Sequence, residues 1–303
     1  VSFIYISHRL EEIEQIADKI IVLRDGNLVS SYENANVPIN KIVHDMVGRD
    51  VDRIFPKIEN NSEIETLRVE NLNSIDGSFE NINFSIKKGE IFGIAGLVGA
   101  GRTELVRAIC GADLLSSGKI FIDKKEISIN SPQEAIKHGI VMVPEDRKSL
   151  GLLLEQSNSQ NISIANFDVF LRSGWVKPNE IKNFAQKGID LMGVKGNTEQ
   201  NVNELSGGNQ QKLLISKWVS RNPKVLIFDE PTRGIDVGAR HSIYQVMKQL
   251  SENGISIIVV SSDLEEVIGL SHRMLILSRG IQKDIILNSD NISRVEIMKQ
   301  ATN

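Results

Sequence analysis

A glycine-rich turn at residues 96–103 has the residue types and spacing of a phosphate-binding loop. It reads Gly96-Leu97-Val98-Gly99-Ala100-Gly101-Arg102-Thr103 and fits G-x-x-x-x-G-K-[ST], except that arginine replaces the lysine. Glycines let backbone N–H groups turn inward around a phosphate, and the start of the following helix adds positive potential. The Thr103 hydroxyl would contact Mg²⁺. Because the lysine is missing, a strand-to-helix turn that binds nothing remains the alternative.

Two carboxylates follow a short apolar run further along the chain. Residues 225–228 are Val-Leu-Ile-Phe, and Asp229 and Glu230 come directly after them. Open α/β sheets bind ligands at the carboxyl ends of their central strands. There Asp229 would hold Mg²⁺ through water, and Glu230 would be the general base for an attacking water. The alternative is a buried strand that ends in two solvated acids.

A Ser-Gly-Gly sequence opens a predicted helix after residue 205. The stretch reads Leu205-Ser206-Gly207-Gly208-Asn209-Gln210-Gln211-Lys212. Exposed N–H groups at such a helix start form a site for anions. An apolar face follows, made of Leu213, Leu214, Ile215 and Trp218. An ordinary helix cap is the alternative, since serine is a preferred capping residue.

The elements that must position these groups are strands and helices in alternation. The apolar run at residues 91–95 is the expected strand before the glycine-rich turn, and residues from about 103 to 110 are the expected helix after it. Strand-like alternation begins at Leu67, and the order of elements predicts a parallel sheet with crossover helices. Residues from about 152 to 220 are rich in helix formers and predict an inserted helical subdomain.

The chain contains an internal repeat. Residues 1–13 match residues 255–267 without a gap, and the same register pairs residues 21–26 with residues 275–280. Self-similarity at this separation indicates duplication of a whole domain. Chance similarity of two strand–turn–helix units is the alternative.

The repeat divides the chain into two expected domains. Residues 1–57 would be the tail of a truncated first domain, beginning inside a strand at Val1, plus a connecting helix at residues 40–47. Residues 58–303 would be the second domain, which contains the three motifs described above.

Composition and charge limit the function classes. Of 303 residues, 41% are apolar and 24% are charged, as in ordinary globular proteins. A net charge of −4 weighs against a nucleic-acid surface, which usually shows as a basic domain. The longest apolar run, residues 257–260, is far shorter than the roughly 20 residues of a membrane span. The single cysteine, Cys110, excludes an intrachain disulfide and fits a reducing compartment.

In their order and spacing, the three motifs resemble the nucleotide-binding domain of ATP-binding-cassette transporters. The resemblance covers residues 67–290, and residues 1–30 are similar to the tail of a first cassette. The glycine-rich loop, Pro-Glu-Asp-Arg-Lys at residues 144–148 and the stretch 229–239 are similar to the second cassette of tandem ATPases in bacterial monosaccharide importers. Nucleoside-importer ATPases are the alternative within this class.

The resemblance implies a fold and a set of partners. The fold would be α/β, with a RecA-like P-loop nucleoside-triphosphatase core, an antiparallel β subdomain and an inserted helical subdomain. ATP and Mg²⁺ would be the cofactors. The chain would pair within its own polypeptide with a first cassette. It would act at the cytoplasmic face of the plasma membrane as a peripheral ATPase, with transmembrane permease subunits and, indirectly, a periplasmic or surface sugar-binding protein as partners and no nucleic acid.

Cassettes of this family pair head to tail, so that each ATP lies between the phosphate loop of one and the Ser-Gly-Gly helix of the other. The resemblance places two groups of residues at nucleotide, with Asp236 in the loop that crosses between the cassettes. This domain's own site has Gly96, Gly99, Ala100, Gly101, Arg102, Thr103, Glu145, Asp229, Glu230 and Ser262, and the opposite site has Ser206, Gly207, Gly208, Gln210 and, as a γ-phosphate contact, His8.

Three positions depart from the family pattern. Arg102 is planar and longer than the usual lysine, Glu145 puts a negative charge where a neutral amide is usual, and Ser262 is shorter than the usual histidine. An adenine-stacking aromatic is also missing, because Phe79 is expected to pack in a strand. We therefore expect ATP binding without fast turnover at this loop, although Glu230 is present. A regulatory nucleotide-binding module and a soluble cassette acting in translation or DNA repair are the alternatives from other classes.

Overall fold

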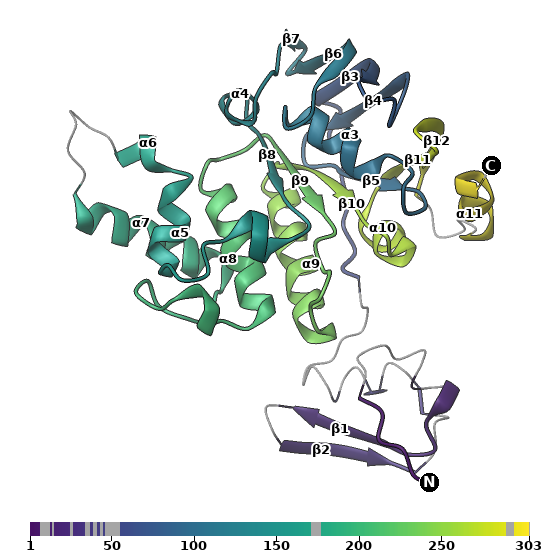
Figure 1. The fold of residues 1–303 in the computed structure, drawn as a ribbon, viewed down its shortest axis with the longest axis vertical. Helices are drawn as coiled ribbons and strands as arrows, with labels where there is room; N and C mark the ends of the chain where they lie inside the picture. Colours follow the sequence, from purple (N-terminus) through teal and green to yellow (C-terminus); the bar gives the residue numbers. More distant parts are fainter. Residues whose placement is uncertain are drawn as a thin grey trace.

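The computed structural model describes most of the chain. The described residues are 1–6, 13, 15–24, 27–33, 37–38, 41–42, 45, 55–170, 177–288 and 294–302. From residue 55 onward they form a central sheet with helices on both faces and a second, antiparallel sheet that covers one face (Figure 1). Within these ranges, no helix combines the length and the apolar character needed to cross a membrane.

The central sheet has six strands in the order β12-β11-β5-β10-β9-β8. Their bounds are β5 Ile91–Ala95, β8 Ile140–Val143, β9 Val225–Asp229, β10 Ser256–Val260, β11 Arg273–Ser278 and β12 Ile281–Leu287. All neighbours pair in parallel except the edge strand β12, which is antiparallel to β11. Every residue of β5, β9 and β10 is buried, as expected for strands covered on both faces. The predicted parallel sheet is confirmed.

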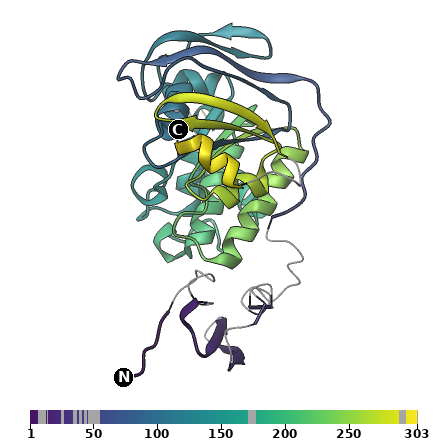
Figure 2. The ribbon, with the colours of Figure 1, turned by 90° about the vertical axis from the view of Figure 1, so that its right-hand side faces the viewer.

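The second sheet is fully antiparallel, with strand order β4-β3-β6-β7. Its strands are β3 Glu65–Ser74, β4 Ile82–Lys87, β6 Leu115–Ile122 and β7 Lys125–Ile127. They share a core with helix α3 (Arg102–Ile109), and Phe84 stacks on Phe92 of β5 with ring centroids 5.1 Å apart. Figure 2 shows this sheet lying across the top of the molecule. The antiparallel subdomain expected from the resemblance is therefore present.

A helical subdomain is inserted between β8 and β9. It contains α5 Asn158–Ile164, α6 Phe167–Phe170, α7 Pro178–Met192 and α8 Gly207–Val219. Ser157 and Gln160 form a capping box at the start of α5, and Gly193 ends α7 in the left-handed conformation, with φ of 58°. Local sequence signals thus set the ends of these helices.

From residue 55 onward, the described residues form four further helices and two short helical turns. The helices are α4 Pro132–Lys137, α9 Val237–Glu252, α10 Leu264–Leu270 and α11 Arg294–Thr302, and the turns are the π-helical Arg147–Gly151 and the 3-10 turn Val202–Glu204. Helices α10 and α11 pack against β11 and the end of β5. Helix α9 packs beside α8 on the same side of the sheet.

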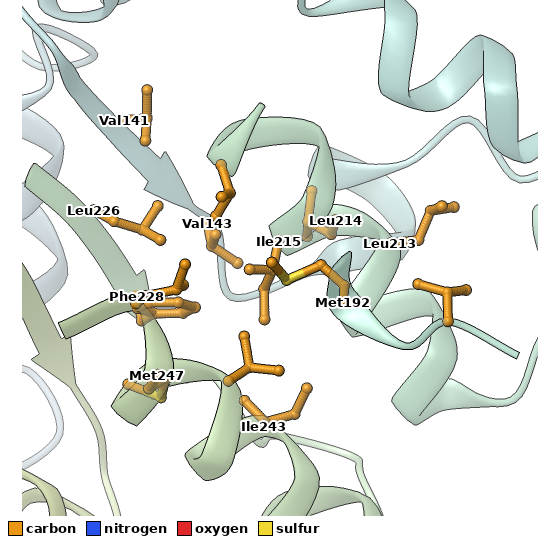
Figure 3. Close-up of a cluster of buried hydrophobic side chains, with 14 of the residues drawn as sticks. Val141, Val143, Met192, Leu213, Leu214, Ile215, Leu226, Phe228, Ile243 and Met247 are labelled. Atoms are coloured by element: carbon orange, nitrogen blue, oxygen red, sulfur yellow. The ribbon is translucent and has the colours of Figure 1, made fainter. Parts of the chain in front are cut away.

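Successive residues of the central strands alternate between two cores, because side chains on a strand point to opposite faces. Leu226 and Phe228 of β9 pack with α8 and α9, as Figure 3 shows, whereas Val225 and Ile227 pack on the other face. Leu105 of α3 lies in that second core. Helices α3 and α8, which carry the two candidate phosphate-binding motifs, therefore lie on opposite faces of the sheet.

The two copies of the internal repeat form the same hairpin. Strands β1 (Ile20–Arg24) and β2 (Asn27–Tyr32) pair antiparallel, with Leu23 opposite Leu28 and a register shift after Val22. In the second copy Leu277 lies opposite Gln282, and the shift follows Ile276. These positions correspond in the sequence repeat, so the repeat holds in pairing register as well as in sequence.

The strand expected at the start of the chain is not formed. Residues 1–6 are exposed and have no regular structure, whereas their counterpart β10 is a buried strand. The difference has a physical cause, since β10 is hydrogen-bonded on both sides, to β5 and β9, whereas no described strand forms a ladder with residues 1–6. The predicted connecting helix at 40–47 falls mostly outside the described residues.

Candidate nucleotide-binding site

The glycine-rich loop joins the end of β5 to the start of α3. A Cβ atom at Gly96 would lie 2.5 Å from the carbonyl oxygen of Leu277, and one at Gly101 would lie 2.4 Å from that of Ser78. Gly99 has open space around it but a φ of +80°, which disfavours other residues. Helix α3 has no side-chain cap, so its first N–H groups stay available to an anion. The backbone therefore fits the predicted phosphate loop.

Thr103 and Asp229 come together from α3 and β9. The Thr103 hydroxyl donates a hydrogen bond to Oδ1 of Asp229 over 3.2 Å. Burial raises the pKa of Asp229 to about 6, the Thr103 hydrogen bond lowers it, and the charge of Glu230 raises it. Mg²⁺ prefers such oxygen ligands and usually takes few from the protein, the rest coming from water and substrate phosphate. In the described ranges no three His, Cys, Asp or Glu side chains cluster as metal ligands.

Glu230 has an unusual backbone conformation at the end of β9. Its φ is +48°, in the left-handed region that a glutamate rarely adopts. Its N–H donates to the carbonyl of Val260 over 2.8 Å, and its Oε2 accepts a hydrogen bond from the Ser262 hydroxyl over 3.0 Å. The carboxylate thus lies beside Asp229 and the end of β10, where the sequence placed a general base.

The guanidinium of Arg102 is held by other residues and does not extend freely into the glycine-rich loop. The side chain is buried, with 7% of the residue exposed, and the guanidinium donates a hydrogen bond to the carbonyl of Ser261. Its Nη2 lies 3.8 Å from Oε1 of Glu230. Burial lowers the pKa of this guanidinium, while the charges of Glu230 and Asp229 raise it. The arginine therefore makes its hydrogen bond at Ser261, directly after β10.

Glu145, at the end of β8, forms an ion pair with Arg233 of the turn after Glu230. The neighbouring Arg147 side chain forms hydrogen bonds in the same region. It donates to the carbonyls of Arg233 over 3.1 Å and Gly234 over 3.4 Å, and to the amide oxygen of Gln210 over 3.3 Å. The segment after β8 is thus tied both to the carboxylate turn and to α8.

The Ser-Gly-Gly sequence begins α8 as predicted. Ser206 is the exposed N-cap residue, its hydroxyl makes no cap bond to the helix backbone, and it accepts a hydrogen bond from Asn209 over 2.9 Å. A Cβ at Gly208 would lie 2.5 Å from that of Ala239, so α8 and α9 approach closely there. Gly207 lies beside Arg147.

Two predicted contact residues have structural partners within the chain. The amide of Gln210 is buried and donates to the carbonyls of Val202 and Leu205 over 3.1 and 3.2 Å. Asp236 caps α9 by accepting from the N–H of Ala239 over 2.9 Å. Both side chains therefore hold the loops around the Ser-Gly-Gly start in place.

The structure separates the predicted residues into two groups. The loop with Ala100, Asp229, Glu230 and Ser262 gathers at the carboxyl edge of the sheet, while Ser206 to Gly208 lie at the start of α8 on the opposite face. His8 lies outside the described residues. Phe79 is buried in the core, as expected, but it lies in the turn between β3 and β4 and not in a strand.

Sequence inspection missed the residues that support the site. Arg147 belongs to the Pro-Glu-Asp-Arg-Lys stretch and Thr232 to the stretch 229–239, but neither was given a role, and Glu266 was not singled out. These two side chains hydrogen-bond each other over 2.6 Å, although they lie 34 positions apart in the sequence. The signal that could have found them is a glutamate on the buried face of a predicted helix.

Comparison with known proteins agrees with this geometry. Residues 79–233 match the family model described as ABC transporter. The ribose import ATP-binding protein RbsA of Geobacillus kaustophilus is 42% identical over 303 residues, covering all of this chain and 61% of that protein. The putative ribose/galactose/methyl galactoside import ATP-binding protein 1 of Agrobacterium fabrum is 43% identical over 305 residues, covering all of this chain and 60% of that protein. The chain thus spans about three fifths of the length of these relatives.

A solved structure is similar in fold. It is the crystal structure of a nucleotide-free ATP-binding cassette from an ABC transporter, which has a TM-score of 0.66 and 22% identity and covers 78% of this chain and 94% of its own. The predicted α/β P-loop nucleoside-triphosphatase fold is thereby confirmed. The family model spans the glycine-rich loop, the Ser-Gly-Gly helix start and both carboxylates, and it matches more than half of the sequence. The chain therefore belongs to the ABC transporter family.

Proposed function

We propose that this chain binds ATP with Mg²⁺ as the second cassette of an ATPase that energises import of a simple sugar across a bacterial inner membrane. The observation that carries the proposal is the meeting of Thr103, Asp229 and Glu230 beside a glycine loop with free N–H groups. Thr103 and Asp229 would hold Mg²⁺, which would offset charge on the phosphates. The sugar is inferred from the names of the ribose and galactoside relatives.

The partners in this proposal are transmembrane permease subunits, with a periplasmic or surface sugar-binding protein acting through them. The chain would sit as a peripheral subunit at the cytoplasmic face of the membrane. The relatives named as import ATP-binding proteins support such an assembly.

Turnover at this chain's own loop is proposed to be slow. Arg102 is engaged by Ser261 and lies beside Glu230, so its charge is shared between a carbonyl and the proposed base. Ser262 holds the same carboxylate with a short hydroxyl, and Glu145 is paired with Arg233. These contacts favour a site that binds nucleotide without rapid hydrolysis.

Residues 1–57 are proposed to end a first cassette that pairs with residues 58–303. The β1–β2 hairpin repeats the register of β11–β12, yet Leu23 is 65% exposed where its counterpart Leu277 is 0% exposed. Strand β11 is hydrogen-bonded along one side to β5, which suggests an equivalent partner strand for β1. Ser206, Gly207 and Gly208 would then serve the first cassette's nucleotide together with His8.

Titration calorimetry with ATP tests the proposed site on this chain. We expect ATP binding that depends on Mg²⁺. The substitution Asp229→Asn should weaken this binding at least about tenfold, because it removes a proposed metal ligand. Asp190→Asn on the exposed face of α7 is the matched control and should bind as the wild type does. Binding that is equal in both variants, or absent in the wild type, would contradict the proposal.

A further inference from the structure

A buried carboxylate lies on α10, outside the phosphate site. Glu266 is 1% exposed, and its Oε1 accepts two hydrogen bonds, from Thr232 Oγ1 over 2.6 Å and from Tyr244 Oη over 2.9 Å. Burial raises the pKa of Glu266, and hydrogen bonds from Ser261, Thr232 and Tyr244 lower it. A buried carboxyl group needs such partners. Three hydroxyls from three segments therefore converge on one side chain.

One of these segments is the turn that carries Glu230. Thr232 follows Glu230 by two residues, and Pro231 between them is buried. Before the turn, the Glu230 N–H is fixed to Val260; after it, the Thr232 side chain is fixed to Glu266. A left-handed φ in a glutamate persists only where the surroundings hold it. The two anchors flank this strained residue and supply that restraint.

Tyr244, one of the donors to Glu266, also contacts Phe55 in the segment that joins the two expected domains. The ring of Tyr244 packs on that of Phe55 with centroids 5.2 Å apart. Phe55 also fills the space above Gly269 of α10, where a Cβ would come within 2.2 Å of its ring. Phe55 therefore rests on α10, the helix that carries Glu266, and on the tyrosine that Glu266 binds.

We propose that Glu266 is a positioning residue that fixes the turn at residues 230–235, and through it the direction of the Glu230 carboxylate toward Ser262. Phe55 supports this arrangement from the joining segment through Tyr244. The inference rests on the proposed nucleotide site, because only there does the direction of Glu230 matter chemically. Glu266 itself touches neither the phosphate loop nor Asp229 in the hydrogen bonds and ion pairs of the described residues.

Amide hydrogen exchange, measured on the whole chain without nucleotide, reports how firmly the turn at residues 230–235 is held. Thr232→Val and Tyr244→Phe each remove one donor to Glu266 while keeping side-chain shape. The N–H groups of Arg233 and Ile235, which bond Glu230 and Thr232, should exchange about tenfold faster in both variants. Thr198→Val is the matched control, a buried threonine in the helical subdomain, and should leave the turn as in the wild type. Unchanged exchange at the turn, or an equal rise throughout the chain, would overturn the proposal.

A kinetic comparison separates this proposal from the proposed function. In single-turnover hydrolysis, Thr232→Val should lower the rate about tenfold while the ATP dissociation constant stays within about twofold, because the change displaces the base and not the loop. Glu266→Gln retains an acceptor oxygen and should restore part of the rate relative to Glu266→Ala. Equal losses in ATP affinity and rate would refute a positioning role. A wild-type chain that binds no ATP would defeat the proposed function, and the exchange data would still decide the role of Glu266.

Discussion

The guanidinium of Arg102 lies with its Nη2 3.8 Å from Oε1 of Glu230 and donates to the carbonyl of Ser261. Arginine has a long stem and a planar fork of donors, so it hydrogen-bonds the carbonyl while keeping its charge near the carboxylate. A lysine ammonium is a compact point charge and cannot bridge them in the same way. The arginine thus connects the phosphate loop to the end of β10 and places its charge beside the proposed base.

Arg102→Lys should raise single-turnover hydrolysis about tenfold, because it releases the Ser261 carbonyl and lets a positive charge follow the phosphates. Single-turnover hydrolysis by the whole chain is the measurement. Arg107→Lys is the control, since Arg107 lies on the same helix but pairs with Asp113. A rate at or below that of the wild type would show that the arginine does not restrain the site.

Asp229→Asn should stabilise the nucleotide-free chain at neutral pH. Burial raises the folded-state pKa of Asp229 to about 6 from 3.8, so the folded chain binds the proton more tightly than the unfolded chain. Stability therefore falls as pH rises from about 4 to 6, and the full cost is present above that window. Urea unfolding at pH 7.5 should show the variant more stable by about 1–3 kcal/mol, with a smaller gain at pH 5. The reverse pH trend would rule out this linkage.

Gly269→Ala should destabilise the chain by about 1–3 kcal/mol, although alanine usually favours a helix over glycine. The new methyl group would fall within 2.2 Å of the Phe55 ring and push it from its site on α10. Most of this loss should disappear in a Phe55→Ala background, where the space is empty. Urea unfolding of the two single variants and the double variant measures the coupling. Additive losses would mean that Phe55 does not occupy this space in solution.

The parts of the site that can be predicted from the sequence are those whose residues all lie within one short segment. The glycine loop and the pair Asp229 and Glu230 each follow a strand, and parallel strands bring their carboxyl ends to the same edge. Placing Thr103 beside Asp229 needed only this rule, and the structure brings them within 3.2 Å.

The rest depends on partners that are distant in the sequence. Arg102 turns to a carbonyl 159 positions away, and Glu266 is held by hydroxyls 22 and 34 positions away, so neither contact has a local signal. Residues 1–6 show the converse, since they have a strand-like pattern but belong to no sheet among the described residues. A strand-like sequence pattern favours an extended chain, but a strand forms only where a neighbouring strand is hydrogen-bonded to it.

In a polypeptide that carries this chain with a first cassette, Ser206→Arg should lower ATP turnover about 10²–10³-fold. Ser206 is exposed at the start of α8, on the face of the sheet opposite to this chain's own loop, and a bulky side chain there would block the helix N–H groups.

The N–H groups at the start of α8 are proposed to meet the first cassette's nucleotide, whose γ-phosphate His8 would contact. His8→Ala should therefore cost a similar factor. Glu230→Gln acts on the slower site and should cost less. Ser117→Arg, at an exposed position of β6, is the control for added charge and bulk. The measurement is the steady-state rate at saturating ATP. If Glu230→Gln abolishes turnover while His8→Ala leaves it near the wild-type rate, the productive site is the one built on Arg102 and Asp229, and the proposed division of labour is reversed.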